Sequence, residues 1–180
     1  MENEFTLLGD ALWLDFVNTA RGRGDTPPDL LPDAAALVRW ATAQRLDLNG
    51  GPPAIDALHR FRDRLTALAE ALHAGLQPPA GSITAINEQL ACGEGRHQLT
   101  RVSGEWRLRF APERRPSILE AIAQSAAGSL ADSLRLVRRC ADPSCSLFFI
   151  DDSPNQSRRW CSTAVCGCQS RVERRRGLLR

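Results

Sequence analysis

Two pairs of closely spaced cysteines near the C-terminus restrict the possible folds of this chain more than any other feature. Cys140 and Cys145 form one Cys-x4-Cys pair, Cys161 and Cys166 form the other, and fifteen residues separate them. Two such pairs can supply four thiolate ligands to a tetrahedral Zn²⁺ ion, with each sulfur about 2.3 Å from the metal. Because four protein ligands leave no open position for a substrate, the spacing predicts one structural zinc ion. A set of buried reduced thiols, or a redox pair, is the alternative interpretation.

The segment around these cysteines has few apolar residues for a core of its own. In residues 138–170 the candidate core side chains are Phe148, Phe149, Ile150, Trp160 and Val165. A lobe of about thirty residues then needs a metal, or contact with a larger domain, to be stable. We therefore expect Trp160 to be a core side chain rather than a platform on which a base stacks.

Cys168 is a second candidate for the fourth metal ligand, because it lies two residues after Cys166. Cys166 keeps the two cysteine turns symmetrical. The predicted ligand set is therefore Cys140, Cys145, Cys161 and Cys166, and the choice between Cys166 and Cys168 stays open.

Composition is typical of a folded protein from a reducing compartment. Hydrophobic residues make up 43% of the 180 residues, which is enough for a core. No stretch approaches the roughly 18 apolar residues of a membrane span, and the N-terminus is acidic where a secretion signal would be basic. Six cysteines in such a chain favour metal binding over disulfides. We expect a cytoplasmic protein without membrane contact.

Hydrophobic periodicity predicts an α+β fold. A predominantly helical N-terminal domain with one β-hairpin spans residues 1–137, and a small zinc-ribbon-like lobe spans residues 138–180. The first predicted helix begins at about Ala11 with Asp10 as its cap, and the next two span residues 32–46 and 54–76, with Leu76 on the apolar face of the third. A fourth helix begins at a cap at Ser82. A fifth begins at a capping box at Ser117 and continues through Leu134 and Val137 directly into Cys140.

The hairpin is predicted from residues 98–110. Trp106, Leu108 and Phe110 alternate with two arginines, which is the pattern of a strand. The dipeptide Ser103-Gly104 before them suits a tight turn.

Charge is divided unevenly between the two predicted regions. Residues 1–134 carry 13 arginines against 17 acidic residues, whereas residues 135–180 carry 10 arginines against 4 acidic residues. A basic lobe on a weakly acidic body favours an anionic partner for the lobe alone.

The arginines at the end of the chain indicate what that partner is. Arg171, Arg174 and Arg175 recur at helical spacing along a predicted helix from Ser162, and few acidic residues lie near them. Arginine forks match phosphate oxygens, so this stripe is interpreted as a nucleic-acid contact, with a solvated helix face as the alternative.

Arginines also stand next to the cysteines. Arg158 and Arg159 are candidates for phosphate contacts as well. The alternative is that these two, with Arg138 and Arg139, only neutralise the negative charge of a zinc tetrathiolate.

A polar group near the N-terminus raises a separate hypothesis. Asp15, Asn18 and Arg21 lie among apolar residues, and they can simply satisfy backbone groups at a helix end and in the following loop. The alternative hypothesis is a pocket for a small-molecule effector, in which Arg21 or Arg23 binds an anionic group.

Along nearly all its length the chain resembles a known family. The pattern Cys-x4-Cys, then Ser-Arg-Arg-Trp-Cys-Ser, then Cys-Gly, is similar to the CGNR zinc finger, and residues 14–19 (Leu-Asp-Phe-Val-Asn-Thr) resemble the N-terminal signature of the ABATE domain. The resemblance implies a stress-linked transcription regulator with a zinc-ribbon-like end that binds nucleic acid. The naming tetrad Cys-Gly-Asn-Arg is altered here to Cys-Gly-Cys-Gln at residues 166–169, and Arg171 is the candidate substitute for the missing basic group.

These patterns together predict a nucleic-acid-binding transcription regulator, with DNA favoured over RNA, one structural Zn²⁺ ion and a possible homodimer. The alternative is a protein-interaction module whose zinc lobe docks on an acidic protein. No enzyme is expected, because the sequence has no phosphate-binding glycine loop and no nucleophile motif.

Overall fold

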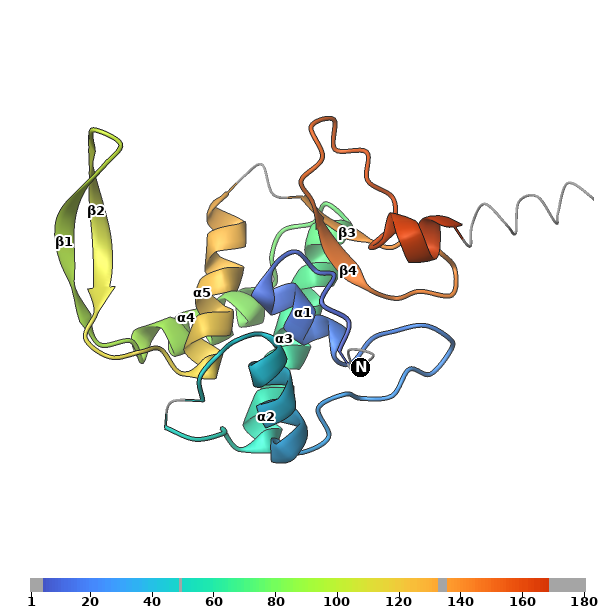
Figure 1. The fold of residues 1–180 in the computed structure, drawn as a ribbon, viewed down its shortest axis with the longest axis horizontal. Coiled ribbons are helices and arrows are strands. Elements are labelled where there is room, and N and C mark those ends of the chain that lie inside the picture. The colour runs from blue at the N-terminus through green and yellow to red at the C-terminus, as the bar shows by residue number, and fades with distance from the viewer. Residues whose placement is uncertain (1–4, 49, 133–135, 169–180) are drawn as a thin grey trace, which may run out of the picture.

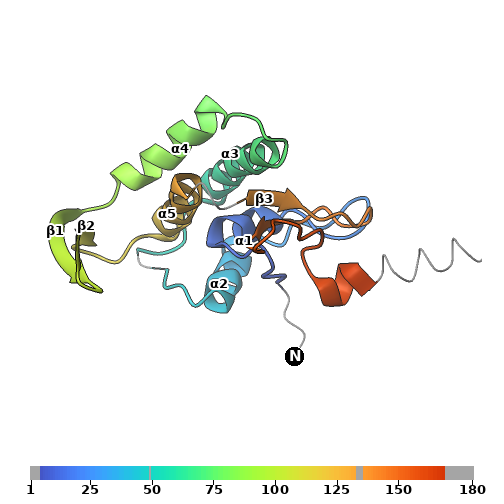
Figure 2. The same cartoon turned by 90° about the horizontal axis from the view of Figure 1, so that it is seen from above.

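A computed structural model describes residues 5–48, 50–132 and 136–168 of the chain. Figures 1 and 2 show helices in the middle of the molecule, a long hairpin that projects at one end, and a small two-stranded lobe at the other. The elements are α1 (Leu12–Asn18), α2 (Ala34–Ala43), α3 (Ile55–His73), α4 (Ala80–Ala91), β1 (Gly95–Val102), β2 (Glu105–Pro112), α5 (Ile118–Ala131), β3 (Leu136–Arg139), β4 (Phe148–Asp151) and the helical turn η1 (Thr163–Gly167). The predicted fold class is confirmed.

Helix α1 lies at the centre of the hydrophobic core, as its apolar spacing predicts. Trp13, Phe16 and Val17 are fully buried. The ring of Phe16 lies 5.7 Å from that of Trp40 in α2 and 6.5 Å from that of Phe61 in α3, measured between centroids. Helix α1 also packs against α5 and β4, and α3 packs against β3, so these two helices join the helical body to the lobe.

Helix α3 presents most of the apolar face that its sequence predicts. Leu58, Leu65 and Leu68 are fully buried in the core. The prediction is wrong at Leu76, which is 64% exposed because the helix ends at His73 and Gly75, with a φ of 69°, turns the chain away. Charged residues cover the other face of α3, and no helix in the described ranges is both long and apolar enough to cross a membrane.

The capping box predicted at Ser117 is confirmed, whereas two other predicted caps are wrong. Ser117 Oγ accepts the N–H of Glu120, and the Glu120 carboxylate accepts the N–H of Ser117. Asp10 has a φ of 58° and makes no capping hydrogen bond to α1. Ser82 is buried within α4 and donates its hydroxyl to the Arg64 carbonyl.

The predicted hairpin is confirmed and is longer than expected. Strands β1 and β2 pair antiparallel over their whole lengths. Ser103 (φ 50°) and Gly104 (φ 89°) form a two-residue turn with both residues in the left-handed conformation that such turns favour. Trp106 and Leu108 are 68% and 67% exposed, because the hairpin extends away from the helices (Figure 1).

The prediction of one continuous helix from Ser117 into Cys140 is wrong. Helix α5 ends at Ala131, and strand β3, paired antiparallel with β4, carries the chain to the first cysteine. Val137 and two side chains of β4 belong to the same hydrophobic core as the helices. The lobe is therefore packed onto the body through its sheet. Leu134, which the prediction placed on the inner helix face, lies outside the described residues.

Candidate metal centre and nucleic-acid interface

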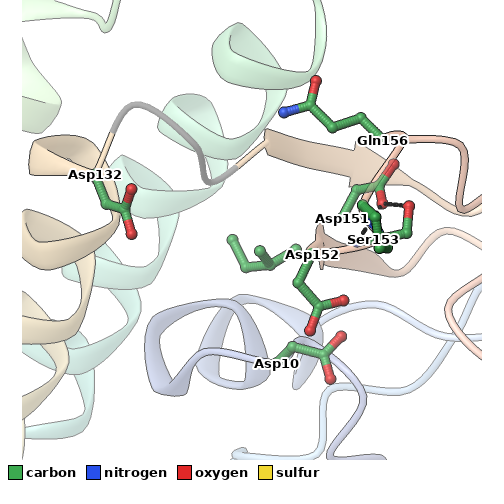
Figure 3. A pocket seen from close by; sticks show the side chains of 8 residues that line it. Asp10, Asp132, Asp151, Asp152, Ser153 and Gln156 are labelled. Carbon is green, nitrogen blue, oxygen red and sulfur yellow. Dashed lines mark hydrogen bonds between the residues drawn. The ribbon is translucent and has the colours of Figure 1, made fainter.

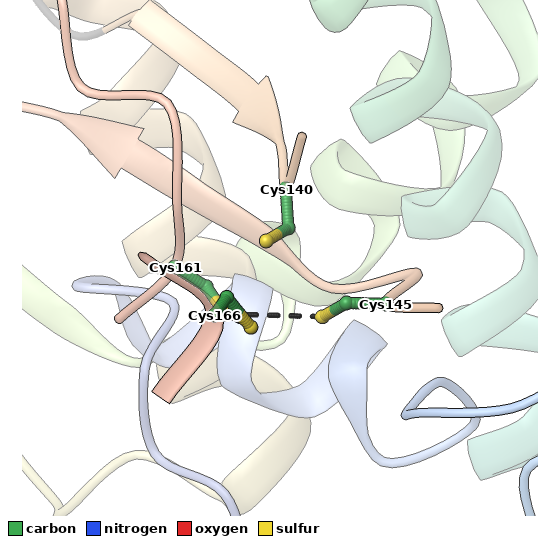
Figure 4. A group of neighbouring side chains, drawn as sticks. All are labelled: Cys140, Cys145, Cys161 and Cys166. Atoms are coloured by element: carbon green, nitrogen blue, oxygen red, sulfur yellow. Dashed lines mark hydrogen bonds between the residues drawn. The ribbon is translucent and has the colours of Figure 1, made fainter. Parts of the chain in front are cut away.

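The four predicted ligands come together in the lobe. The Sγ atoms of Cys140, Cys145, Cys161 and Cys166 all lie within 4.8 Å of one another, and all four residues are buried (Figure 4). Cys140 directly follows β3, Cys145 lies in the connection to β4, Cys161 lies just before the turn η1, and Cys166 lies within it. Cys168 is exposed and is not part of the group. Cys166 is thus the fourth member of the cluster.

The distances between the sulfur atoms suit a tetrahedral metal site. With zinc–sulfur distances of about 2.3 Å, tetrahedral angles place sulfur atoms roughly 3.8 Å apart. The Sγ atoms of Cys145 and Cys161 are 3.8 Å apart, and those of Cys161 and Cys166 are 3.6 Å apart. The cluster fits one structural zinc ion held by four thiolates, which leaves no ligand position for a substrate.

Without a bound metal, the thiols of the cluster differ in pKa. Hydrogen bonds from Cys145 and Cys161 lower the pKa of Cys140, whereas burial raises the pKa of Cys166 to about 12. Zinc binds thiolates, so binding must displace the protons of such thiols, and zinc affinity falls as the pH is lowered.

A short turn shapes the first cysteine pair. The N–H of Cys145 donates to the Asp142 carbonyl at 2.9 Å. Asp142 Oδ1 accepts the N–H and the hydroxyl of Ser144, at 3.0 and 2.8 Å. Burial alone would raise the pKa of Asp142, but these hydrogen bonds and the nearby Arg23 outweigh it and lower the pKa. A buried, ionised carboxylate therefore stands beside the sulfur cluster.

The second cysteine pair is shaped by Ser162 and Gly167. Ser162 Oγ accepts the N–H of Val165 at 3.3 Å and so caps η1, where the sequence predicted a helix to begin. The N–H of Gly167 donates to the Ser162 carbonyl at 3.1 Å, and a Cβ atom on Gly167 would make ordinary van der Waals contacts with Thr163 and Trp160. Trp160 is half-buried against the cysteine cluster, in the core position that the sequence indicated.

Arg158, a predicted phosphate ligand, makes several contacts within the protein. Its Nε donates to the Trp160 carbonyl at 3.1 Å, and Nη2 donates to the Cys161 carbonyl at 2.7 Å. Its Nη1 pairs with Asp10 at 2.6 Å, and the guanidinium lies 4.5 Å from the ring centroid of Phe149. Most of its hydrogen-bond donors are therefore already used within the protein.

Arg159 has a different environment. It is exposed, and its guanidinium lies 5.2 Å from the ring centroid of Trp160, which offers a rigid support. Arg171, Arg174 and Arg175, the stripe predicted to contact phosphate, lie outside the described residues. Their role stays a prediction.

One side of the lobe carries an acidic pocket of about 400 Å³ (Figure 3). The carboxylates among its lining residues are Asp10, Asp132, Asp151 and Asp152. Asp151 is buried and accepts hydrogen bonds from the N–H and hydroxyl of Ser153 and from Arg138 Nε. Arg158 pairs with Asp10 and Asp152, and Arg138 pairs with Asp151, so arginines offset much of the acidic charge of this pocket.

The residues of the hypothetical effector pocket all have partners within the protein. Asp15 Oδ1 accepts the N–H of Gly9 at 2.8 Å, and Oδ2 accepts Gln44 Nε2 at 3.0 Å. Burial raises the pKa of Asp15 above its ordinary value. The effector remains a prediction.

The other two residues of that group face strand β4. Asn18 exchanges two hydrogen bonds with the backbone of Phe148. Arg21 pairs with Glu70 of α3, and its guanidinium lies 4.6 Å from the ring centroid of Phe148. Both side chains thus connect the body to the lobe.

Arg23, considered for an effector anion, lies against the metal cluster. Its Nη1 donates to Cys166 Sγ at 3.0 Å, and Nη2 donates to Asp142 Oδ2 at 3.1 Å. Burial disfavours the charged guanidinium, but the negative charges of Asp142 and Cys166 outweigh it and raise the pKa of Arg23. No local pattern could have shown this contact, because Arg23 and Cys166 are far apart in the sequence.

The fold and the cluster together define a helical protein with a small structural zinc lobe of the four-cysteine type. Comparison with family models identifies both parts. The ABATE model, described as "Putative stress-induced transcription regulator", matches residues 10–133, and the CGNR zinc finger model matches residues 136–177. The chain belongs to the ABATE family of transcription regulators and ends in a CGNR zinc finger, which confirms the resemblance. Among curated proteins, none matches this sequence.

Proposed function

We propose that this transcription regulator binds nucleic acid through its zinc lobe, and that the nucleic acid is DNA rather than RNA. One observation carries the proposal: four buried cysteines fit a closed zinc site. A site of this kind fixes the shape of a small lobe and performs no chemistry on a substrate. The family assignment favours DNA, because a regulator of transcription acts at the template.

Charge supports the lobe as the contact surface. Residues 135–180 have a net charge of +6 from 10 arginines and 4 acidic residues. We propose that Arg159 and the stripe of Arg171, Arg174 and Arg175 contact phosphates, while Arg158 maintains the shape of the lobe.

The salt dependence of binding tests this proposal. Each phosphate contact on duplex DNA contributes about −0.9 to the slope of log affinity against log salt concentration. Binding of a fluorescent duplex, measured by anisotropy at several salt concentrations, is expected to show a slope of about −4 for four contacts. Changing Arg171, Arg174 and Arg175 together to alanine should make that slope about three units shallower.

A matched control removes the same charge elsewhere. Changing Arg96, Arg107 and Arg109 of the exposed hairpin to alanine also removes three positive charges, yet it should leave the slope unchanged. Equal flattening in both variants would mean that net charge, and not the C-terminal stripe, determines binding. A wild-type protein with bound zinc and no salt-dependent binding would contradict the proposal.

The second candidate function is a protein-interaction module. The observation that favours it is that Arg158 is largely used within the lobe, which leaves fewer arginines for phosphate. In that case the lobe should bind an acidic protein surface and show no measurable affinity for duplex DNA at physiological salt. Competition between poly-glutamate and duplex DNA for the zinc-loaded protein distinguishes the two functions.

A homodimer is part of the proposed function, because one small lobe offers limited contact area on DNA. Sedimentation velocity over a range of protein concentrations tests it. A single species with the mass of 19.8 kDa at every concentration would contradict it.

A further inference from the structure

The loop between α1 and α2 pairs with the first cysteine turn of the lobe. The N–H of Gly24 donates to the Ser144 carbonyl at 2.8 Å, and the N–H of Ser146 donates to the Gly22 carbonyl at 2.9 Å. Arg23, between the two glycines, forms an antiparallel bridge with Cys145. A segment of the ABATE domain therefore lies directly on the zinc finger.

The Arg23 side chain extends from this pairing to the sulfur cluster. Nη2 is anchored twice, by Asp142 Oδ2 at 3.1 Å and by Ser144 Oγ at 2.7 Å. The same guanidinium then donates from Nη1 to Cys166 Sγ at 3.0 Å. Because Asp142 is itself buried and fixed by the turn, the direction of the guanidinium is set before any metal binds.

The negative charge of a zinc tetrathiolate explains what this contact contributes. Four thiolates around one Zn²⁺ ion leave a formal net charge of −2, and a buried charge needs a partner. The sequence suggested neighbouring arginines for this role, but Arg138 pairs with Asp151, and Arg158 pairs with Asp10 and with carbonyl groups. Arg23, in contrast, donates a hydrogen bond directly to the Cys166 sulfur.

We propose that Arg23 is a positioning residue of the zinc site: the ABATE domain supplies the hydrogen bond and the positive charge that stabilise the Cys166 thiolate. Arg23 thereby sets the zinc affinity of the finger. Coupling of this kind is reciprocal, so zinc binding also stabilises the loop of the body that carries Arg23. The inference depends on the zinc site and not on nucleic-acid binding.

Zinc affinity of the full-length protein tests the inference. Arg23→Met keeps an unbranched apolar stem in place of the arginine methylene chain but removes the guanidinium, with its charge and donors. Competition with a chromophoric chelator should show zinc affinity 10- to 100-fold weaker than wild type, the usual cost of losing such an outer partner of a metal ligand. Arg115→Met is the matched control, because Arg115 is exposed and pairs with Asp47 of the body. Its zinc affinity should equal that of wild type, and an equal affinity in Arg23→Met would overturn the proposal.

A second variant separates an effect on the sulfur from an effect on the loop. Cys166→His keeps a zinc ligand but removes the sulfur that accepts the hydrogen bond. If Arg23 acts through that sulfur, Arg23→Met should cost little further zinc affinity in the Cys166→His background. The full 10- to 100-fold loss in both backgrounds would assign Arg23 to loop packing alone and would overturn the proposal.

If Cys166→His binds no zinc, the Co²⁺ form of Arg23→Met with its four cysteines intact supplies the test. Loss of an N–H···S hydrogen bond should shift the thiolate-to-cobalt charge-transfer band relative to wild type and to Arg115→Met. An unshifted band would contradict a role through the sulfur.

Discussion

Asn18 of α1 pairs with the backbone of Phe148 in β4 as a neighbouring strand would. Its Nδ2 donates to the Phe148 carbonyl at 2.8 Å, and its Oδ1 accepts the Phe148 N–H at 2.9 Å. Both residues are almost completely buried. Asn18 therefore satisfies both backbone groups of Phe148 at the free edge of the small sheet, where the N–H of Ile150 donates to the Gly9 carbonyl, and it links the zinc lobe to the helical body.

Asn18→Ala should destabilise the zinc-loaded protein by about 2 to 4 kcal/mol. The substitution leaves a buried N–H and a buried carbonyl without partners, and each such group costs about 1–3 kcal/mol. The free energy of unfolding, from urea denaturation followed by tryptophan fluorescence, measures the loss. Asn87→Ala, at an exposed position of α4, should stay within about 0.5 kcal/mol of wild type. A similar stability of the two variants would show that the Asn18 pairing contributes little.

The fourth zinc ligand can be identified by metal content. Cys166→Ser should lose most of its zinc after dialysis, because it removes a member of the sulfur cluster. Cys168→Ser should keep one zinc ion per chain, because Cys168 is exposed and outside that cluster. Atomic emission on the purified variants measures both. The reverse result would mean that Cys168 is the ligand in solution.

The cysteine ligands and several local elements could be predicted because their determinants lie close together in the sequence. Two Cys-x4-Cys pairs place sulfur atoms on tight turns whatever surrounds them. Ser117 and Glu120 form a capping box within one helical turn, and Ser103-Gly104 determines a hairpin turn through its own backbone preferences.

Features that depend on distant partners could not be predicted. Val137 continues the apolar spacing of the preceding helix, yet it lies in a short strand because β4 provides hydrogen bonds and a core contact there. The role of Arg23 depends on a sulfur atom in the other domain, and that of Asn18 depends on the edge of a strand. Only the tertiary fold brings these pairs together.

Replacement of Trp13 and of Trp106 by alanine should change the free energy of unfolding by very different amounts. Trp13 is fully buried, and its Nε1 donates to Ser129 Oγ at 3.0 Å, so Trp13→Ala should cost about 3–5 kcal/mol. Trp106 is 68% exposed on the hairpin, so Trp106→Ala should change the free energy of unfolding by no more than about 0.5 kcal/mol.

Urea denaturation of both variants at the same low protein concentration measures this difference, with far-ultraviolet circular dichroism as the probe because each variant lacks one fluorophore. A loss of several kcal/mol in Trp106→Ala would show that the exposed face of the hairpin is covered in solution. A small loss in Trp13→Ala would contradict the central place of α1 in the core.

The dependence of stability on pH should reveal the ion pair at the start of α5. Arg114 donates to both carboxylate oxygens of Glu120, at 3.0 and 2.6 Å, and Ser117 donates its N–H as well. These contacts, led by the hydrogen bonds from Arg114, lower the pKa of Glu120 despite its burial. Because the folded protein holds the ionised form, the stabilisation is present above 4.5, the ordinary pKa of the group, and is lost as the pH falls through the lowered value.

Glu120→Gln removes the charge but keeps an oxygen that can accept the Ser117 N–H, so it isolates this titration. The variant should be less stable than wild type at pH 7, and the difference should shrink as the pH is lowered below 4.5. Zinc release in acid destabilises the variant and the wild type alike, so it cancels in the difference between their free energies of unfolding. Urea denaturation at several pH values gives the two stability curves, with Glu88→Gln on the exposed face of α4 as the control. A difference that stays constant down to pH 3, or that grows in acid, would show that the folded state does not favour the ionised form of Glu120.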